Sequence, residues 1–145
     1  MSDVRTLGLD LGDRKLGVAI SDPLGLTAQG ITTREREGEA RDIAWLRSLC
    51  QEREVTRLVV GLPRNMNGSE GPRAEKSRRF ARALREALQL PVFLWDERLS
   101  TAEAERMLIQ ADVSRQKRGL VIDKLAAQIL LQGYLDAGQP EVDPA

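Results

Sequence analysis

The 145-residue sequence contains no histidine and a single cysteine, Cys50. These absences exclude a Ser-His-Asp triad, a histidine-based metal site, a cysteine-rich zinc site and an intramolecular disulfide. Carboxylates, hydroxyls, lysine and arginine remain for chemistry, and this set suits hard divalent cations such as Mg²⁺ or Mn²⁺. Aromatic residues are also few, with two Trp, two Phe and one Tyr. Base stacking is therefore expected to be a minor mode of any nucleic-acid recognition.

The sequence has neither a membrane-length apolar run nor an apolar segment of signal-peptide type at its start. This pattern predicts a cytoplasmic protein without a membrane partner. The 22 basic and 22 acidic residues balance, which argues against a bulk electrostatic binder of nucleic acid. Their distribution is uneven, with seven basic and two acidic residues in 64–85, then six acidic and two basic in 86–112. Basic surface can hold phosphates, and clustered acids can hold divalent cations.

Hydrophobic periodicity predicts an α/β fold. The expected strands are Val4–Leu11, 16–20, 27–33, Leu58–Val60 and Pro91–Trp95. The expected helices are Glu39–Glu54, Pro72–Leu88, one beginning at Ser100, and Leu120–Ala137. An opening antiparallel meander followed by β-α-β units gives a mixed five-stranded sheet with helices on both faces, the layout of the ribonuclease H-like fold. We expect one domain over residues 1–137 and a disordered acidic tail over 138–145.

Three segments far apart in the sequence each offer a carboxylate. Asp10 lies in a strand among small residues, Asp96 and Glu97 end a strand, and Asp123 adjoins the apolar stripe of the last helix. Taken singly, these acids are also explained by a turn, by helix-start electrostatics and by a solvated helix face. Taken together, they provide the carboxylates that two-metal phosphodiester chemistry requires.

Four motifs, spread over nearly the whole chain, resemble those of the YqgF/RuvX family of Holliday junction resolvase-like nucleases. They are Leu7-Gly8-Leu9-Asp10-Leu11-Gly12 with Gly17-Val18-Ala19, Val60-Gly61-Leu62-Pro63 with Asn67-Gly68, Asp96-Glu97-Arg98-Leu99-Ser100-Thr101, and Ile122-Asp123-Lys124 with Ala126-Ala127.

The resemblance implies a metal-dependent nuclease. Asp10, Glu97 and Asp123 would be its catalytic residues and metal ligands, with Asp96 in support and one or two Mg²⁺ or Mn²⁺ ions bound. It further implies a nucleic-acid partner, either a branched DNA or the 5′ end of the precursor of 16S ribosomal RNA, and it does not choose between them. We expect a monomer or a weak homodimer.

Basic and amide side chains in three segments are candidates for binding nucleic acid. They are Arg64 and Asn67 on a loop, Arg78, Arg82 and Arg85 at helical spacing, and Arg115, Lys117 and Arg118 on a segment, 112–119, expected to form a mobile lid. An ordinary polar loop, a solvated basic face and an exposed connector remain the alternatives for these three groups.

Two other functions are compatible with parts of the sequence. One is a non-catalytic RNA-binding factor in ribosome maturation. The other is an actin-like ATPase fold, whose first hairpin also carries Asp-x-Gly. Such ATPases need two domains around the nucleotide, and a chain of this length supplies one.

Overall fold

The computed structural model describes residues 4–96 and 115–145, and it describes side chains for 4–96 and 125–145. The predicted helix beginning at Ser100 lies outside these residues. The strands are β1 (Thr6–Leu11), β2 (Lys15–Ser21), β3 (Ala28–Glu35), β4 (Arg57–Leu62) and β5 (Val92–Asp96). The helices are α1 (Glu39–Glu52), α2 (Pro72–Leu88) and α4 (Arg115–Asp136).

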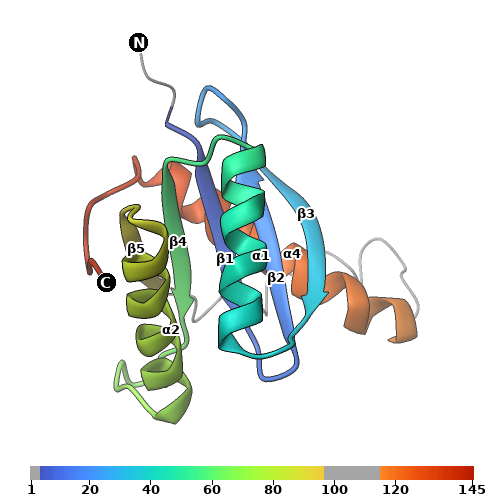
Figure 1. Ribbon diagram of the computed structural model, residues 1–145. Helices are drawn as coiled ribbons and strands as arrows, with labels where there is room; N and C mark the ends of the chain where they lie inside the picture. Colours follow the sequence, from blue (N-terminus) through green and yellow to red (C-terminus); the bar gives the residue numbers. More distant parts are fainter. Residues whose placement is uncertain (1–3, 97–114) are drawn as a thin grey trace.

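The five strands form one mixed sheet in the order β3-β2-β1-β4-β5 (Figure 1). β1 is the central strand. It pairs antiparallel with β2, with Leu9 opposite Val18, and parallel with β4, with Leu9 beside Val60. The predicted mixed five-stranded sheet is therefore confirmed. Its topology places the carboxyl ends of β1, β4 and β5 at the same edge.

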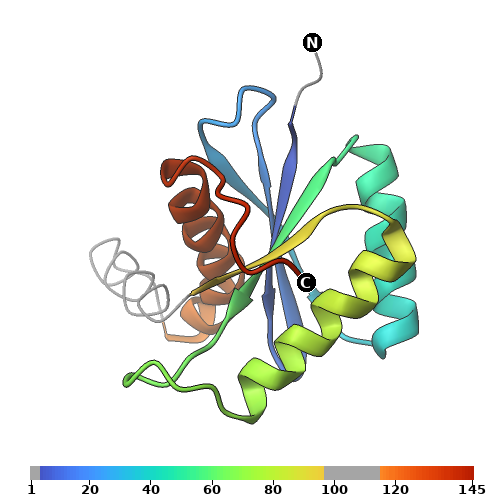
Figure 2. The same cartoon turned by 90° about the vertical axis from the view of Figure 1, so that its left-hand side faces the viewer.

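Helices cover both faces of the sheet, as predicted, with α1 and α2 on one side and α4 on the other (Figure 2). The alternation of side chains along each strand divides the core accordingly. Leu7 and Leu9 of β1 belong to the cluster that packs with α1 and α2. On the other face, Ala19 and Val59 pack with Leu131 and other residues of α4.

Gly8 lets α4 lie close against the central strand. A Cβ atom at position 8 would come within 2.8 Å of the Leu131 Cβ and 3.5 Å of the Ala127 carbonyl oxygen. Earlier in β1, the Thr6 hydroxyl donates a hydrogen bond to Gln139, which follows α4. β1 and α4 therefore run in opposite directions, and successive residues of β1 meet progressively earlier residues of the helix.

We expect Gly8→Ala to lower the free energy of unfolding by about 1–3 kcal/mol, because the added methyl group must push α4 away from β1. Urea denaturation followed by circular dichroism measures the change. Gly133→Ala is the matched control, since its Cβ would meet only the Trp95 indole nitrogen at an ordinary 3.6 Å and alanine favours the helix. Equal stability of the two variants would contradict the close approach at Gly8.

The prediction of a disordered tail at 138–145 is wrong. The Leu94 amide donates to the Asp143 carbonyl at 3.0 Å, and the Ala145 amide donates to the Val92 carbonyl at 2.9 Å. The Asp143 carboxylate also accepts a hydrogen bond from Arg78 at 2.8 Å. The segment orders because β5 offers unpaired backbone groups at the sheet edge, which the composition of the tail does not reveal.

The predicted loop over 112–119 is also corrected where the structure describes it, because α4 begins at Arg115. Arginine, glutamine and lysine favour helices, and Gly119 in the interior costs only about 1 kcal/mol relative to alanine. Residues 115–119 are therefore helical and do not support the predicted mobile lid. Residues 112–114 lie outside the described residues. Within the part of the chain that is described, no helix is both long and apolar enough to cross a membrane.

Candidate functional site

Asp10 lies near the carboxyl end of the central strand, on a surface made of glycines. The alternation of β1 puts Asp10 on the same face as Gly8, which is the face that α4 covers. Gly17 is its register partner on β2. On the other flank, Val60 of β4 is the partner of Leu9. The next residue of β4, Gly61, therefore lies beside Asp10. The neighbouring strand residues on the two flanks of Asp10 therefore add no side chain beside the carboxylate.

Asp96 ends β5 at the same edge of the sheet, but on the other face. Leu94 packs in the core under α1 and α2, whereas the Trp95 ring meets the Tyr134 ring of α4 edge-on at 5.5 Å. Alternation then directs Asp96 to the side of Leu94, away from the face of Asp10. Glu97, the next residue, lies outside the described residues.

Asp123 belongs to α4, and its side chain is not among those described. The direction of α4 nevertheless indicates where Asp123 lies along β1. Gly8 meets Leu131 and Ala127, and Asp10 is two residues further along β1, which runs opposite to α4. Asp123 is one helical turn before Ala127. The order of these contacts predicts that Asp123 is level with Asp10.

The available donors fit a hard divalent cation. Among the described residues, no three metal-ligating side chains form a cluster, and two of the four predicted ligands have side chains outside that set. Cys50 is not a competing ligand, since it is buried and burial raises the pKa of its thiol to about 11. Asp10 offers carboxylate oxygens beside Gly17 and Gly61, and such oxygens are the ligands that Mg²⁺ and Mn²⁺ prefer.

Arg78, predicted to bind nucleic acid, is engaged by two carboxylates of the protein itself. It donates to Glu70 at 2.7 Å through two nitrogens and to Asp143 at 2.8 and 3.0 Å. These hydrogen bonds, that to Glu70 first, hold the pKa of Arg78 above its ordinary value. Arg64 joins the network at 3.7 Å from Glu70 and 3.9 Å from Asp143. The structure thus gives Arg78 a bracing role between the β4–α2 loop, α2 and the C-terminal segment.

The other predicted binding residues belong to three different parts of the structure. Asn67 shapes its own loop, because its side-chain oxygen accepts from the Ser69 amide and hydroxyl. Arg82 and Arg85 are exposed on α2, and Arg85 lines a hollow that also contains Pro144. Arg115, Lys117 and Arg118 belong to the first turns of α4, and their side chains lie outside the described part of the chain.

The sequence pattern did not single out a second basic group, which lies beside the β1–β2 turn. Arg36 follows β3, and Arg73, Lys76 and Arg79 lie three residues apart on α2. They line two adjoining hollows that also contain the turn residue Asp13. The spacing of the three α2 residues is visible in the sequence. Their position beside the β1–β2 turn is not, because it depends on how α2 crosses the sheet.

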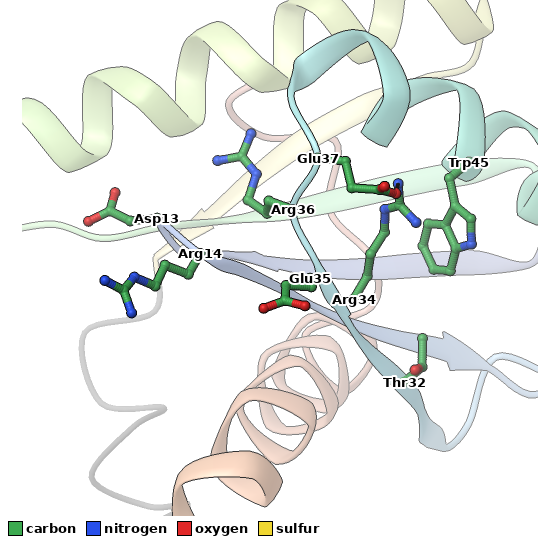
Figure 3. A pocket seen from close by; sticks show the side chains of 8 residues that line it. All are labelled: Asp13, Arg14, Thr32, Arg34, Glu35, Arg36, Glu37 and Trp45. Atoms are coloured by element: carbon green, nitrogen blue, oxygen red, sulfur yellow. Dashed lines mark hydrogen bonds and ion pairs between the residues drawn. The ribbon is translucent and has the colours of Figure 1, made fainter.

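A further hollow of about 820 Å³ lies on the other side of Arg36 (Figure 3). Its lining contains three arginines, Arg14, Arg34 and Arg36, and three acids, Asp13, Glu35 and Glu37. The Arg34 guanidinium is 5.0 Å from the centre of the Trp45 ring. Because these charges balance, this hollow has less attraction for a phosphate than the basic group on α2.

The sequence matches a known protein family over most of its length. The profile of the family described as "RuvX: Holliday junction resolvase" matches residues 4–137. A relative in Myxococcus xanthus (strain DK1622), named "Putative pre-16S rRNA nuclease", is 59% identical over 137 residues, covering 94% of this chain and 91% of the relative. A relative of the same name in Geobacillus kaustophilus (strain HTA426) is 61% identical over 136 residues, covering 92% and 99%.

Solved structures resemble this one at low sequence identity. RuvC of Thermus thermophilus superposes with a TM-score of 0.57 at 14% identity, covering 98% of this chain and 100% of that one. The Holliday junction resolvase of fowlpox virus gives a TM-score of 0.57 at 15% identity, covering 92% and 99%. These similarities concern the fold, and they confirm the predicted ribonuclease H-like class. Since the family profile spans residues 4–137 and the two relatives are 59% and 61% identical, the chain belongs to the RuvX family.

Proposed function

We propose that this protein is a divalent-metal-dependent nuclease that hydrolyses phosphodiester bonds in structured nucleic acid. The observation that carries the proposal is Asp10 itself, a carboxylate on a glycine surface at the end of the central strand, under the helix that bears Asp123. Family membership and the names of the relatives support the same reaction.

In this proposal Asp10, Glu97 and Asp123 hold one or two Mg²⁺ or Mn²⁺ ions. When bound, such ions lower the pKa of water and stabilise the charge of the leaving oxygen. The carboxylates keep the ions in position, and the glycines at positions 17 and 61 leave space for a phosphate beside Asp10 on the two neighbouring strands. Asp96 has a lesser role, because the pleat of β5 directs it to the other face.

We propose the 5′ end of the precursor of 16S ribosomal RNA as the first substrate to test, since the relatives at about 60% identity carry that name. A four-way DNA junction is the second, because the description of the family names a Holliday junction resolvase. The shared chemistry is cleavage of a phosphodiester bond, whichever sugar carries it.

The test offers the pure protein each substrate with Mn²⁺, with Mg²⁺ and with a chelator. We expect cleavage of the RNA precursor that depends on metal and stops on chelation. Cleavage of the junction alone would assign the DNA substrate. Binding without cleavage under every metal condition would overturn the proposal and favour the non-catalytic maturation factor.

A further inference from the structure

A basic groove begins directly after Asp10, on the side of the sheet that α1 and α2 cover. It has a volume of about 440 Å³ and continues into a smaller hollow toward the start of α2. Leu11 and Gly12, which follow Asp10 in the sequence, are part of its lining. We call it the α2 groove, and its charged lining consists of Asp13, Arg36, Glu39, Arg73, Lys76 and Arg79.

Positive charge predominates in the α2 groove, with four cations against two acids. Arg73, Lys76 and Arg79 are all exposed. Among the described residues, Arg73 and Arg79 form no ion pair, and Lys76 reaches Asp13 only at 3.7 Å. This situation differs from that of Arg78 on the same helix, whose guanidinium is engaged by two carboxylates at hydrogen-bonding distance.

Arg36 forms a fixed wall opposite α2, and its charge is paired with a buried carboxylate. Its Nε is 3.1 Å from the buried Asp42 carboxylate, and its Nη1 donates to the Gly12 carbonyl at 3.2 Å. The guanidinium also lies 5.5 Å from the centre of the Phe80 ring of α2. In Figure 3 it points from the β3–α1 connection toward α2. The groove is thus held open by contacts within the protein.

We propose that the α2 groove binds the phosphodiester backbone of the substrate next to the bond that is cut. This inference rests on the proposed nuclease function. A strand whose phosphate lies at Asp10 needs only to cross Leu11 and Gly12 at the sheet edge to enter the groove. Exposed lysine and arginine at regular spacing neutralise successive phosphates and fix the register of a strand without reading its bases.

The test compares two double variants of one helix. Lys76→Ala/Arg79→Ala removes two charges from the groove. Arg82→Ala/Arg85→Ala is the matched control, with the same spacing, the same charge loss and exposed positions further along α2. Binding is measured by fluorescence anisotropy in a chelator, so that no cleavage occurs, with a labelled four-way DNA junction and a labelled RNA duplex as probes.

We expect the groove variant to bind more weakly. The slope of log K against log salt should flatten by about 0.9 for each DNA phosphate that the variant no longer neutralises. The control should keep a slope near that of the wild type. In metal-containing assays KM should rise while kcat changes much less, since the removed side chains serve binding. A groove that binds only RNA would show its effect with the RNA duplex probe alone.

If the control variant weakened binding as much as the groove variant, or more, the proposal that the α2 groove binds the substrate backbone would be overturned. This outcome is distinct from failure of the nuclease proposal, which would appear as a wild-type protein that binds both probes and cuts neither substrate. Thermal melting of both variants shows whether any weakening comes from unfolding.

Discussion

Asp10→Asn is expected to reduce cleavage by at least about 100-fold, more than the loss of a residue that merely orients a metal ligand. The change keeps the size of the side chain and removes the negative charge that a divalent cation requires. The free energy of unfolding should remain close to that of the wild type, because Asp10 stands on glycines and not in the aliphatic core. Single-turnover cleavage with saturating Mn²⁺ measures the effect.

Asp96→Asn makes the same chemical change on the opposite face of the sheet. If the pleat of β5 decides which acids reach the metal, Asp96→Asn should lose far less activity than Asp10→Asn. Similar losses in both variants would contradict the separation of the two faces. An Asp10→Asn protein that retains full, chelator-sensitive activity would place the metal elsewhere.

Asp42→Asn is expected to produce the largest loss of stability. Asp42 is completely buried at the start of α1, and it accepts hydrogen bonds from Arg34, from Arg36 and from the Glu37 amide at 3.0–3.2 Å. The variant removes the carboxylate that pairs with Arg36 and leaves Arg34 with Glu37 alone, at 2.7 Å. We expect the free energy of unfolding to fall by about 3 kcal/mol. This value is at the lower end of the range for breaking a buried ion pair, because Arg34 and Arg36 keep some exposure to solvent.

Urea denaturation of Asp42→Asn and of Glu39→Gln separates this network from the general effect of an acid in the first turn of a helix. Glu39 is exposed in the same turn, so its loss should cost about 0.3–1 kcal/mol. Equal losses in the two variants would show that the arginines find other partners.

The same network gives stability a defined pH dependence. Burial raises the pKa of Asp42, but hydrogen bonds from the Glu37 amide, Arg36 and Arg34 outweigh it, so the pKa lies below its ordinary value. The ionised Asp42 carboxylate therefore contributes its full stabilisation above the pKa of an aspartate in the unfolded chain, about 3.9. This stabilisation is lost as the pH falls through the lower pKa of Asp42 in the folded state. Asp42→Asn should lack this part of the acid-induced loss.

The elements of this fold are predictable because each strand and helix carries its own periodicity. Leu7 and Leu9 alternate with Gly8 and Asp10, and that pattern alone gives a strand with one aliphatic and one open face. The interactions that correct the predictions are those between distant segments. Asp143 pairs with Arg78 across 65 positions of sequence, and no local pattern in either segment predicts this contact.

The same distinction applies to the candidate site. Asp10 can be chosen from its small neighbours, and the faces of Asp10 and Asp96 follow from the pleat once the strand bounds are known. Helical spacing favours Arg78, Arg82 and Arg85, but spacing does not tell which way a helix turns on a sheet. Once α2 is placed, Arg73, Lys76 and Arg79 are the residues beside the β1–β2 turn.

One of the two tryptophans packs on each face of the sheet. Trp45 of α1 packs at the margin of the larger aliphatic cluster, whereas Trp95 packs against the smaller cluster under α4. Their fluorescence therefore reports separately on the two sides, once each tryptophan is replaced in turn by phenylalanine. Because Asp10 shares its face with Trp95, detachment of α4 would inactivate the enzyme while the Trp45 signal remained native. Detachment of α4 and unfolding of the whole domain thus become distinguishable by fluorescence in parallel titrations of the two variants.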